Sequence, residues 1–146
     1  MSNIRIIVGD DLVLSSGLTS PIWVEIDGCT FPDEDWVDFS HTLLCRWTDA
    51  LLSYTGSAPG IRFGFMDGPY EIVIHGNINE PLTLCCMRED KCLLKGECTR
   101  RDLADALYRA LKRMGYLLHE SGLDEGNSGW MAEEIRARTA RLLELI

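Results

Sequence analysis

The sequence predicts an α+β fold, with an antiparallel sheet packed against helices, and three observations support this prediction. Short β-branched runs fill the first third of the chain. Four further runs in the middle are joined by segments too short for crossover connections, so neighbouring strands are expected to pair antiparallel. Apolar residues in the last third recur every three or four positions, as in amphipathic helices. The predicted order is β-β-β-α-β-β-β-β-α-α, in one domain spanning residues 1–146.

The first three strands are predicted at residues 4–8, 12–14 and 21–27. The glycine and two aspartates at positions 9–11 supply turn residues between the first two strands. In the third run, Ile22, Val24 and Ile26 alternate with aromatic or acidic neighbours, which is the pattern of a half-buried strand.

The first helix is predicted to begin at residues 32–35, because acidic side chains are favoured at a helix N-terminus. It is expected to end before the glycine- and proline-rich segment 56–60. Its apolar stripe consists of Trp36, Leu43, Leu44, Trp47, Leu51 and Tyr54.

The middle of the chain predicts a four-stranded meander, with strands at residues 61–66, 70–75, 81–87 and 91–98. Two helices are predicted to follow. Thr99 and Asp102 form a variant of the capping box at the start of the first, which ends near residues 121–122. Ser128 is predicted to cap the second, whose apolar face runs from Met131 to Leu145.

The net charge of −9 is unevenly distributed along the chain. Residues 1–98 contain 15 acids and 6 bases, whereas residues 99–146 contain 8 of each. The segment 25–38, which we call the acidic segment, holds six acids and no Lys or Arg. Such a field repels nucleic acid and anionic membrane and attracts basic protein partners. A solvated surface that includes a helix N-terminus is the alternative explanation.

No catalytic, cofactor or metal site is predicted, and the chain is not expected to be an enzyme. His41 and Cys45 are spaced to meet on one helix face, but Cys45 falls within the apolar stripe and is expected to pack as a small buried residue. The six cysteines lack the paired short spacing of a zinc site, and the three histidines are scattered. Phosphate-binding glycine motifs are absent from the sequence.

A partner-binding surface is therefore predicted on the acidic segment, with Trp36 as an aromatic anchor inside a rim of acids. For Trp23 and Trp36, core packing and interface contact both remain open, whereas Trp47 is expected in the core. The predicted partner-binding residues are Glu25, Asp27, Asp33, Glu34, Asp35, Trp36 and Asp38. The alternative is a structural or regulatory protein that acts by self-association, and both a monomer and a homodimer fit the sequence.

Two motifs resemble a known group of proteins. They are Cys29-Thr-Phe-Pro-Asp-Glu-Asp-Trp-Val-Asp-Phe39 and Arg62-Phe-Gly-Phe-Met-Asp-Gly-Pro-Tyr70. Roughly residues 22–76 resemble small bacterial proteins similar to the immunity proteins of polymorphic-toxin and contact-dependent inhibition systems. The resemblance implies a protein that binds and neutralises a toxin domain, many of which are basic nucleases. A cytoplasmic location is expected, because the N-terminal residues are unlike a secretory signal and no apolar run approaches the roughly 18 residues of a membrane helix.

Overall fold

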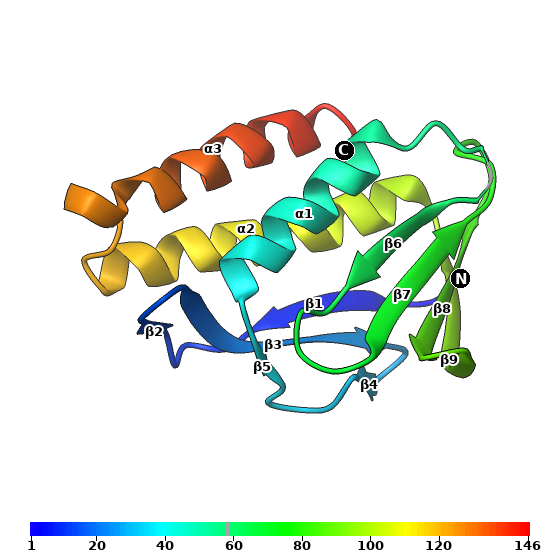
Figure 1. The fold of residues 1–146 in the computed structure, drawn as a ribbon. Helices are drawn as coiled ribbons and strands as arrows, with labels where there is room; N and C mark the ends of the chain where they lie inside the picture. Colours follow the sequence, from blue (N-terminus) through cyan, green and yellow to red (C-terminus); the bar gives the residue numbers. More distant parts are fainter. Residues whose placement is uncertain (58) are drawn as a thin grey trace.

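The described residues form two antiparallel sheets and three α-helices, which confirms the predicted α+β class (Figure 1). The structure is a computed structural model that describes residues 1–57 and 59–146. Its elements are β1 (Ile4–Val8), β2 (Val13–Leu14), β3 (Leu18–Ile26), β4 (Cys29–Phe31), β5 (Val37–Asp38), α1 (Ser40–Ser53), β6 (Ile61–Gly64), β7 (Tyr70–His75), β8 (Leu82–Arg88), β9 (Lys91–Cys98), α2 (Arg100–Glu120), a 3-10 turn (Gly126–Ser128) and α3 (Gly129–Leu143).

The first sheet is built around β3, which pairs with β1, β2, β4 and β5. Val24 lies opposite both Ile6 and Phe31, so β1 and β4 occupy opposite edges of β3. Ile22, Val24 and Ile26 are buried as the alternation predicts. Trp23, on the other face of the strand, is largely enclosed too, with 9% of its surface exposed.

The second sheet is the predicted meander, in the order β6-β7-β8-β9. Its strands agree with the predicted ranges to within two residues at each end. A bulge between Cys86 and Met87 interrupts the β8–β9 register. The two sheets meet where the amide of Ser2 donates to the carbonyl of Glu97 at 2.7 Å.

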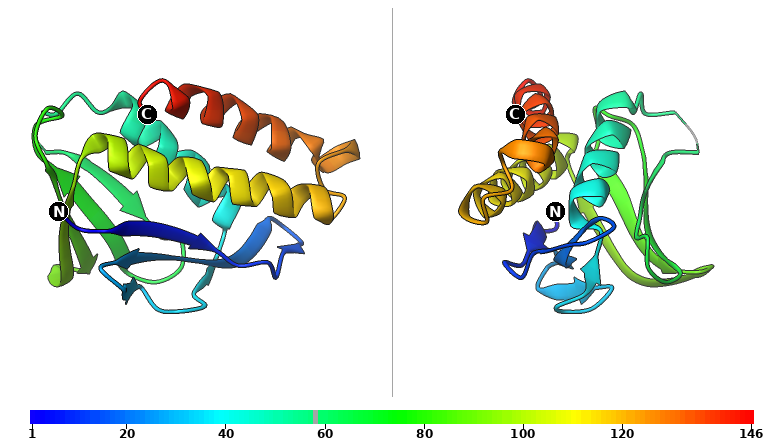
Figure 2. Two further views of the ribbon diagram at one scale, coloured as in Figure 1. Left: turned by 180° about the vertical axis from the view of Figure 1, so that it is seen from behind. Right: turned by 60° about the vertical axis from the view of Figure 1, so that its left-hand side comes forward.

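Helix α1 packs against both sheets, α2 packs against β1, and α3 packs on α1 and α2, so that one core runs through helices and sheets (Figure 2). In the right-hand view, α1 lies between the α2–α3 pair and the β6–β9 sheet. Trp47 on α1 is buried, stacks on Phe63 of β6 with ring centroids 5.3 Å apart, and donates its indole N–H to the carbonyl of Gly64 at 3.0 Å. The expected core role of Trp47 is confirmed.

The sequence predicted one of the two caps of the C-terminal helices correctly. Thr99 stands at the N-cap of α2, and its hydroxyl accepts the amide of Asp102 at 3.0 Å. Ser128 stands at the N-cap position of α3, but its hydroxyl donates to the carbonyl of Glu125 at 3.4 Å instead of capping the helix. Ser128 has the αR backbone, φ −99° and ψ 0°, whereas a capping side chain needs an extended residue.

The predicted start of α1 is wrong. The helix begins at Ser40, after β4 and β5 have paired with β3, and the acids at positions 33–35 lie in the connection between these short strands. Asp35 has φ 61°, a left-handed conformation that a helix start excludes. The sheet pairing of Phe31 and Val37 thus overrides the local preference of the acids for a helix N-terminus.

Candidate functional site

The acidic segment is organised by two turns that favour aspartate for backbone reasons. Asp27 and Gly28 form the two-residue turn between β3 and β4, with φ values of 52° and 83°. Two successive positive φ angles match the hairpin turn for which Asp-Gly is a preferred sequence. Asp35 adopts the same left-handed region, which aspartate tolerates better than most residues. The turns therefore explain the residue type at positions 27 and 35.

Four of the six acids project into solvent. Asp27, Asp33, Glu34 and Asp35 are exposed, and the ion pairs found among the described residues do not involve them. Glu25 is half-buried and pairs with Arg5 across β1 and β3 at 3.1 Å. The exposed part of the predicted site is therefore a group of four carboxylates, with Glu25 at its edge.

Asp38 has a different environment from the other acids. It is 2% exposed. One carboxylate oxygen accepts the amide of Phe39 at 2.7 Å, and the other accepts the amides of Met66 and Asp67 at 3.1 Å and the indole N–H of Trp36 at 3.2 Å. Asp38 thus holds the acidic segment against the loop that follows β6, and its oxygens face donors within the protein.

Trp36 is half-buried, and contacts within the protein cover most of its side chain. Its ring packs edge to face on Tyr70 with centroids 5.2 Å apart, and its indole N–H donates a hydrogen bond to Asp38. Two apolar side chains beside it are exposed instead: Val37 at 53% and Met66 at 47%. Both flank the Asp38 contact, so the surface combines uncompensated acids with accessible apolar side chains. No pattern in the sequence marks either residue as part of a site.

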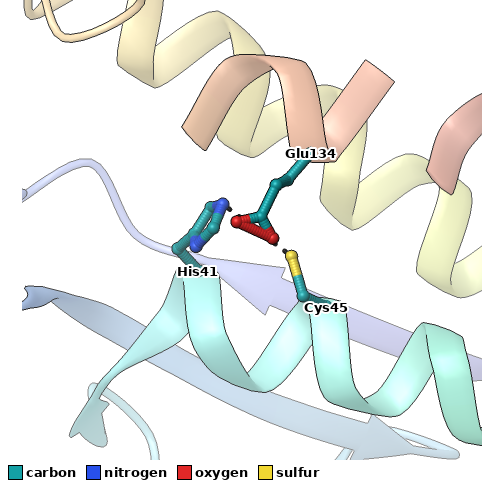
Figure 3. A group of neighbouring side chains, drawn as sticks. All are labelled: His41, Cys45 and Glu134. Carbon is teal, nitrogen blue, oxygen red and sulfur yellow. Dashed lines mark hydrogen bonds between the residues drawn. The ribbon is translucent and has the colours of Figure 1, made fainter. Parts of the chain in front are cut away.

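A second group of chemically capable side chains lies between α1 and α3 (Figure 3). The Nε2 atom of His41 lies 3.8 Å from Sγ of Cys45, one turn along α1, and 3.2 Å from the carbonyl oxygen of Met131. Burial lowers the pKa of His41, and burial raises the pKa of Cys45 to about 11. At neutral pH the pair is therefore a neutral imidazole beside a protonated thiol, not a thiolate beside an imidazolium.

Glu134 completes this group from α3. Its carboxylate, the Cys45 sulfur and a ring nitrogen of His41 all lie within 4.8 Å of one another. Arg138 reaches Glu134 at 3.4 Å and also pairs with Asp49 through two nitrogens, at 2.9 and 3.0 Å. The spacing of His41 and Cys45 predicts that these two side chains meet, but no sequence spacing links them to Glu134 on another helix.

Comparisons of the chain with protein-family models, with curated proteins and with solved structures found no match. Among the described residues, no helix is both long and apolar enough to cross a membrane.

Proposed function

We propose that this chain is an immunity-type binding protein that acts in the cytoplasm and neutralises a basic, nuclease-like toxin domain through the acidic segment. The observation that carries the proposal is the set of exposed carboxylates of Asp27, Asp33, Glu34 and Asp35 in one segment, which also exposes the side chain of Val37 and is joined through Asp38 to exposed Met66. The resemblance of roughly residues 22–76 to such proteins gives the proposal its biological class.

The charged and the apolar side chains of this surface have different roles in binding. The four carboxylates attract a basic partner over a distance of about one Debye length, roughly 8 Å at physiological salt, and so raise the association rate. Val37 and Met66 supply the apolar area that a stable interface buries at its centre. Asp38 and Trp36 hold the backbone of the segment in place, so the surface is formed before the partner arrives.

Neutralising the acids without disturbing the turns tests this proposal. The variant carries Asp27→Asn, Asp33→Asn, Glu34→Gln and Asp35→Asn; asparagine accepts the left-handed backbone of positions 27 and 35. The control carries Asp10→Asn, Asp11→Asn, Glu120→Gln and Glu125→Gln, which removes the same charge from exposed sites elsewhere.

The wild-type chain and both variants serve as baits in native cell extract, and the association rate of any captured basic domain is then measured against salt. We expect the control to capture the same domain as wild type, with a rate that falls steeply as salt rises. The acidic-segment variant should associate at least tenfold more slowly, with a flatter salt dependence. Equal capture and equal salt slopes for the two variants would remove this surface from the function.

Self-association is the second candidate function. It is favoured by the edge of β1 that faces α2, which pairs with no other strand of residues 1–57 and 59–146. The Asp27 amide bonds the Asn3 carbonyl and the Gly9 amide bonds the Pro21 carbonyl, so the alternate residues Ile4, Ile6 and Val8 direct their backbone groups away from β3. A groove of about 440 Å³, lined by residues 3–7 together with Asp105, Ala106 and Arg109 of α2, runs along this edge. An unpaired apolar edge strand can pair with a second copy.

Proline at position 4 distinguishes the two candidates. Ile4→Pro removes one outward-facing amide and leaves the β1–β3 hydrogen bonds intact, since proline is tolerated at a free strand edge. If the protein is a dimer through β1, light scattering should show Ile4→Pro as a monomer. A wild-type chain that is monomeric at high micromolar concentration excludes this candidate.

A further inference from the structure

Three side chains that favour transition metals converge between α1 and α3. His41 and Cys45 lie one turn apart on α1, and Glu134 approaches them from α3 (Figure 3). Their donor atoms all lie within 4.8 Å of one another, and the sulfur–nitrogen distance is 3.8 Å. On a tetrahedral zinc ion, with bonds of about 2.0–2.3 Å, neighbouring donor atoms stand roughly 3.3–3.7 Å apart. Movements of a few tenths of an ångström at His41 and Cys45, and a larger one at Glu134, would bring the donors to those distances.

The donor set also matches the ion. A thiolate and an imidazole suit zinc and similar borderline ions, whereas calcium and magnesium prefer sites made of oxygen alone. One thiolate and one carboxylate offset the two positive charges of the ion, so the loaded site would be electrically neutral. A neutral site is compatible with the burial of His41 and Cys45, which are 4% and 6% exposed.

The contacts that these groups now make are replaceable. His41 shares its Nε2 with the Met131 carbonyl at 3.2 Å; a shift of the ring proton to Nδ1 frees Nε2 as a ligand. Arg138 reaches Glu134 at 3.4 Å but keeps two shorter bonds to Asp49, so it stays paired when Glu134 turns to a metal. The Glu134 side chain is 39% exposed and gives an ion a route from solvent.

We propose that His41, Cys45 and Glu134 bind a zinc-type divalent ion through one imidazole nitrogen, one thiolate and one carboxylate oxygen. Water completes the four-coordinate shell on the side of Glu134. On binding, the thiol proton of Cys45 leaves to solvent and the sulfur takes its place as a metal ligand, with no change in oxidation state. The ion joins α1 to α3, so its binding stabilises the packing of the two helices.

Cobalt titration of the metal-free protein tests this site, because cobalt(II) occupies zinc sites and shows a thiolate charge-transfer band in the near ultraviolet. We expect one cobalt per chain, the charge-transfer band, and loss of the band on addition of zinc. About one proton should be released per ion bound. Zinc should also raise the midpoint of thermal unfolding. No band at stoichiometric cobalt, together with an unchanged midpoint in zinc, overturns the proposal.

Matched variants identify the ligands. Cys45→Ser should abolish the band, whereas Cys29→Ser and Cys92→Ser, which remove exposed thiols, should retain it. Glu134→Gln alters a half-exposed side chain, so it keeps the test valid if Cys45→Ser folds poorly; it should weaken cobalt binding at least tenfold. A band that survives Cys45→Ser and disappears with an exposed thiol assigns the metal to the surface and overturns the proposal.

Discussion

At the scale of single residues, the aspartates of the acidic segment have separate roles that their shared charge conceals. Asp27 and Asp35 occupy left-handed backbone positions, where asparagine would serve equally well. Asp38 accepts four hydrogen bonds within the protein. Asp33 accepts the amide of Glu34, the next residue, and Glu34 itself extends into solvent. Only the exposed acids are free to meet a partner, so the predicted site divides into a surface and its support.

The first of these roles has a local signal in the sequence, whereas the second has none. Asp-Gly is a favoured pair for a two-residue hairpin turn, because both residues tolerate positive φ, but the predicted third strand ran through Asp27 and missed this turn. The role of Asp38 depends on the amides of Met66 and Asp67, which the fold brings to it from a distant loop. Contacts between residues that are far apart in the sequence produce no periodic pattern, and the contact of Glu134 with Cys45 is another example.

The burial of His41 predicts how stability depends on pH. Burial lowers its pKa below the ordinary value of 6.5, so the unfolded state binds a proton more readily than the folded state. The unfolding free energy should therefore be constant with respect to this group above pH 6.5 and decrease as pH falls from 6.5 through the lowered pKa of the folded state. His41→Gln removes this contribution to the pH dependence of the unfolding free energy.

Urea unfolding of the metal-free protein between pH 7 and 5 measures the effect. We expect wild type to lose stability faster than His41→Gln over this range, although the variant is less stable at pH 7. His119→Gln is the control: the hydrogen bond that exposed His119 donates to Asp124 raises the pKa of His119, which gives the opposite sign, with stability lost as pH rises. Parallel acid slopes for wild type and His41→Gln would contradict the assignment.

At the scale of elements, the structure distinguishes signals that act locally from those that tertiary pairing overrides. The meander strands and α2 follow their periodicity and turn residues closely, because their neighbours in sequence are also their neighbours in space. The start of α1 does not follow its local signal. The segment 32–36 has acids suited to a helix N-terminus, but β4 and β5 keep the chain extended along β3.

The N-cap of α2 gives a quantitative prediction at this scale. The Thr99 hydroxyl satisfies the amide of Asp102, which no other helix carbonyl can reach. Thr99→Ala should lower the unfolding free energy by about 1 kcal/mol. Thr99→Ser keeps the hydroxyl and should lose less than half of that, and chemical denaturation of the three proteins compares them. Ser128→Ala is the matched control, since the Ser128 hydroxyl does not cap α3; equal losses at both positions would contradict the capping role of Thr99.

At the scale of the whole molecule, α1 connects the two sheets. Its buried residues contact β3 of the first sheet, β6 of the second and both C-terminal helices, so no layer can separate without exposing them. The sequence correctly predicted strands before α1, and strands followed by helices after it. It predicted too few strands for the first sheet. It missed that four strands of the described residues, two of them only two residues long, pair with β3. Two-residue strands carry no periodicity, so only the pairing itself identifies them.

This arrangement predicts that residues 1–146 unfold as one cooperative unit. Trp47 packs on β6, at the junction of α1 with the second sheet, and is 1% exposed. In a protein with phenylalanine at Trp23, Trp36 and Trp130, Trp47 fluorescence reports that junction alone, while far-ultraviolet circular dichroism reports all helices and strands. The two signals should give the same urea midpoint and slope, as two-state unfolding requires. A fluorescence transition that precedes the loss of helix signal would instead show that the β6–β9 sheet opens from α1 first, and that the single core is really two.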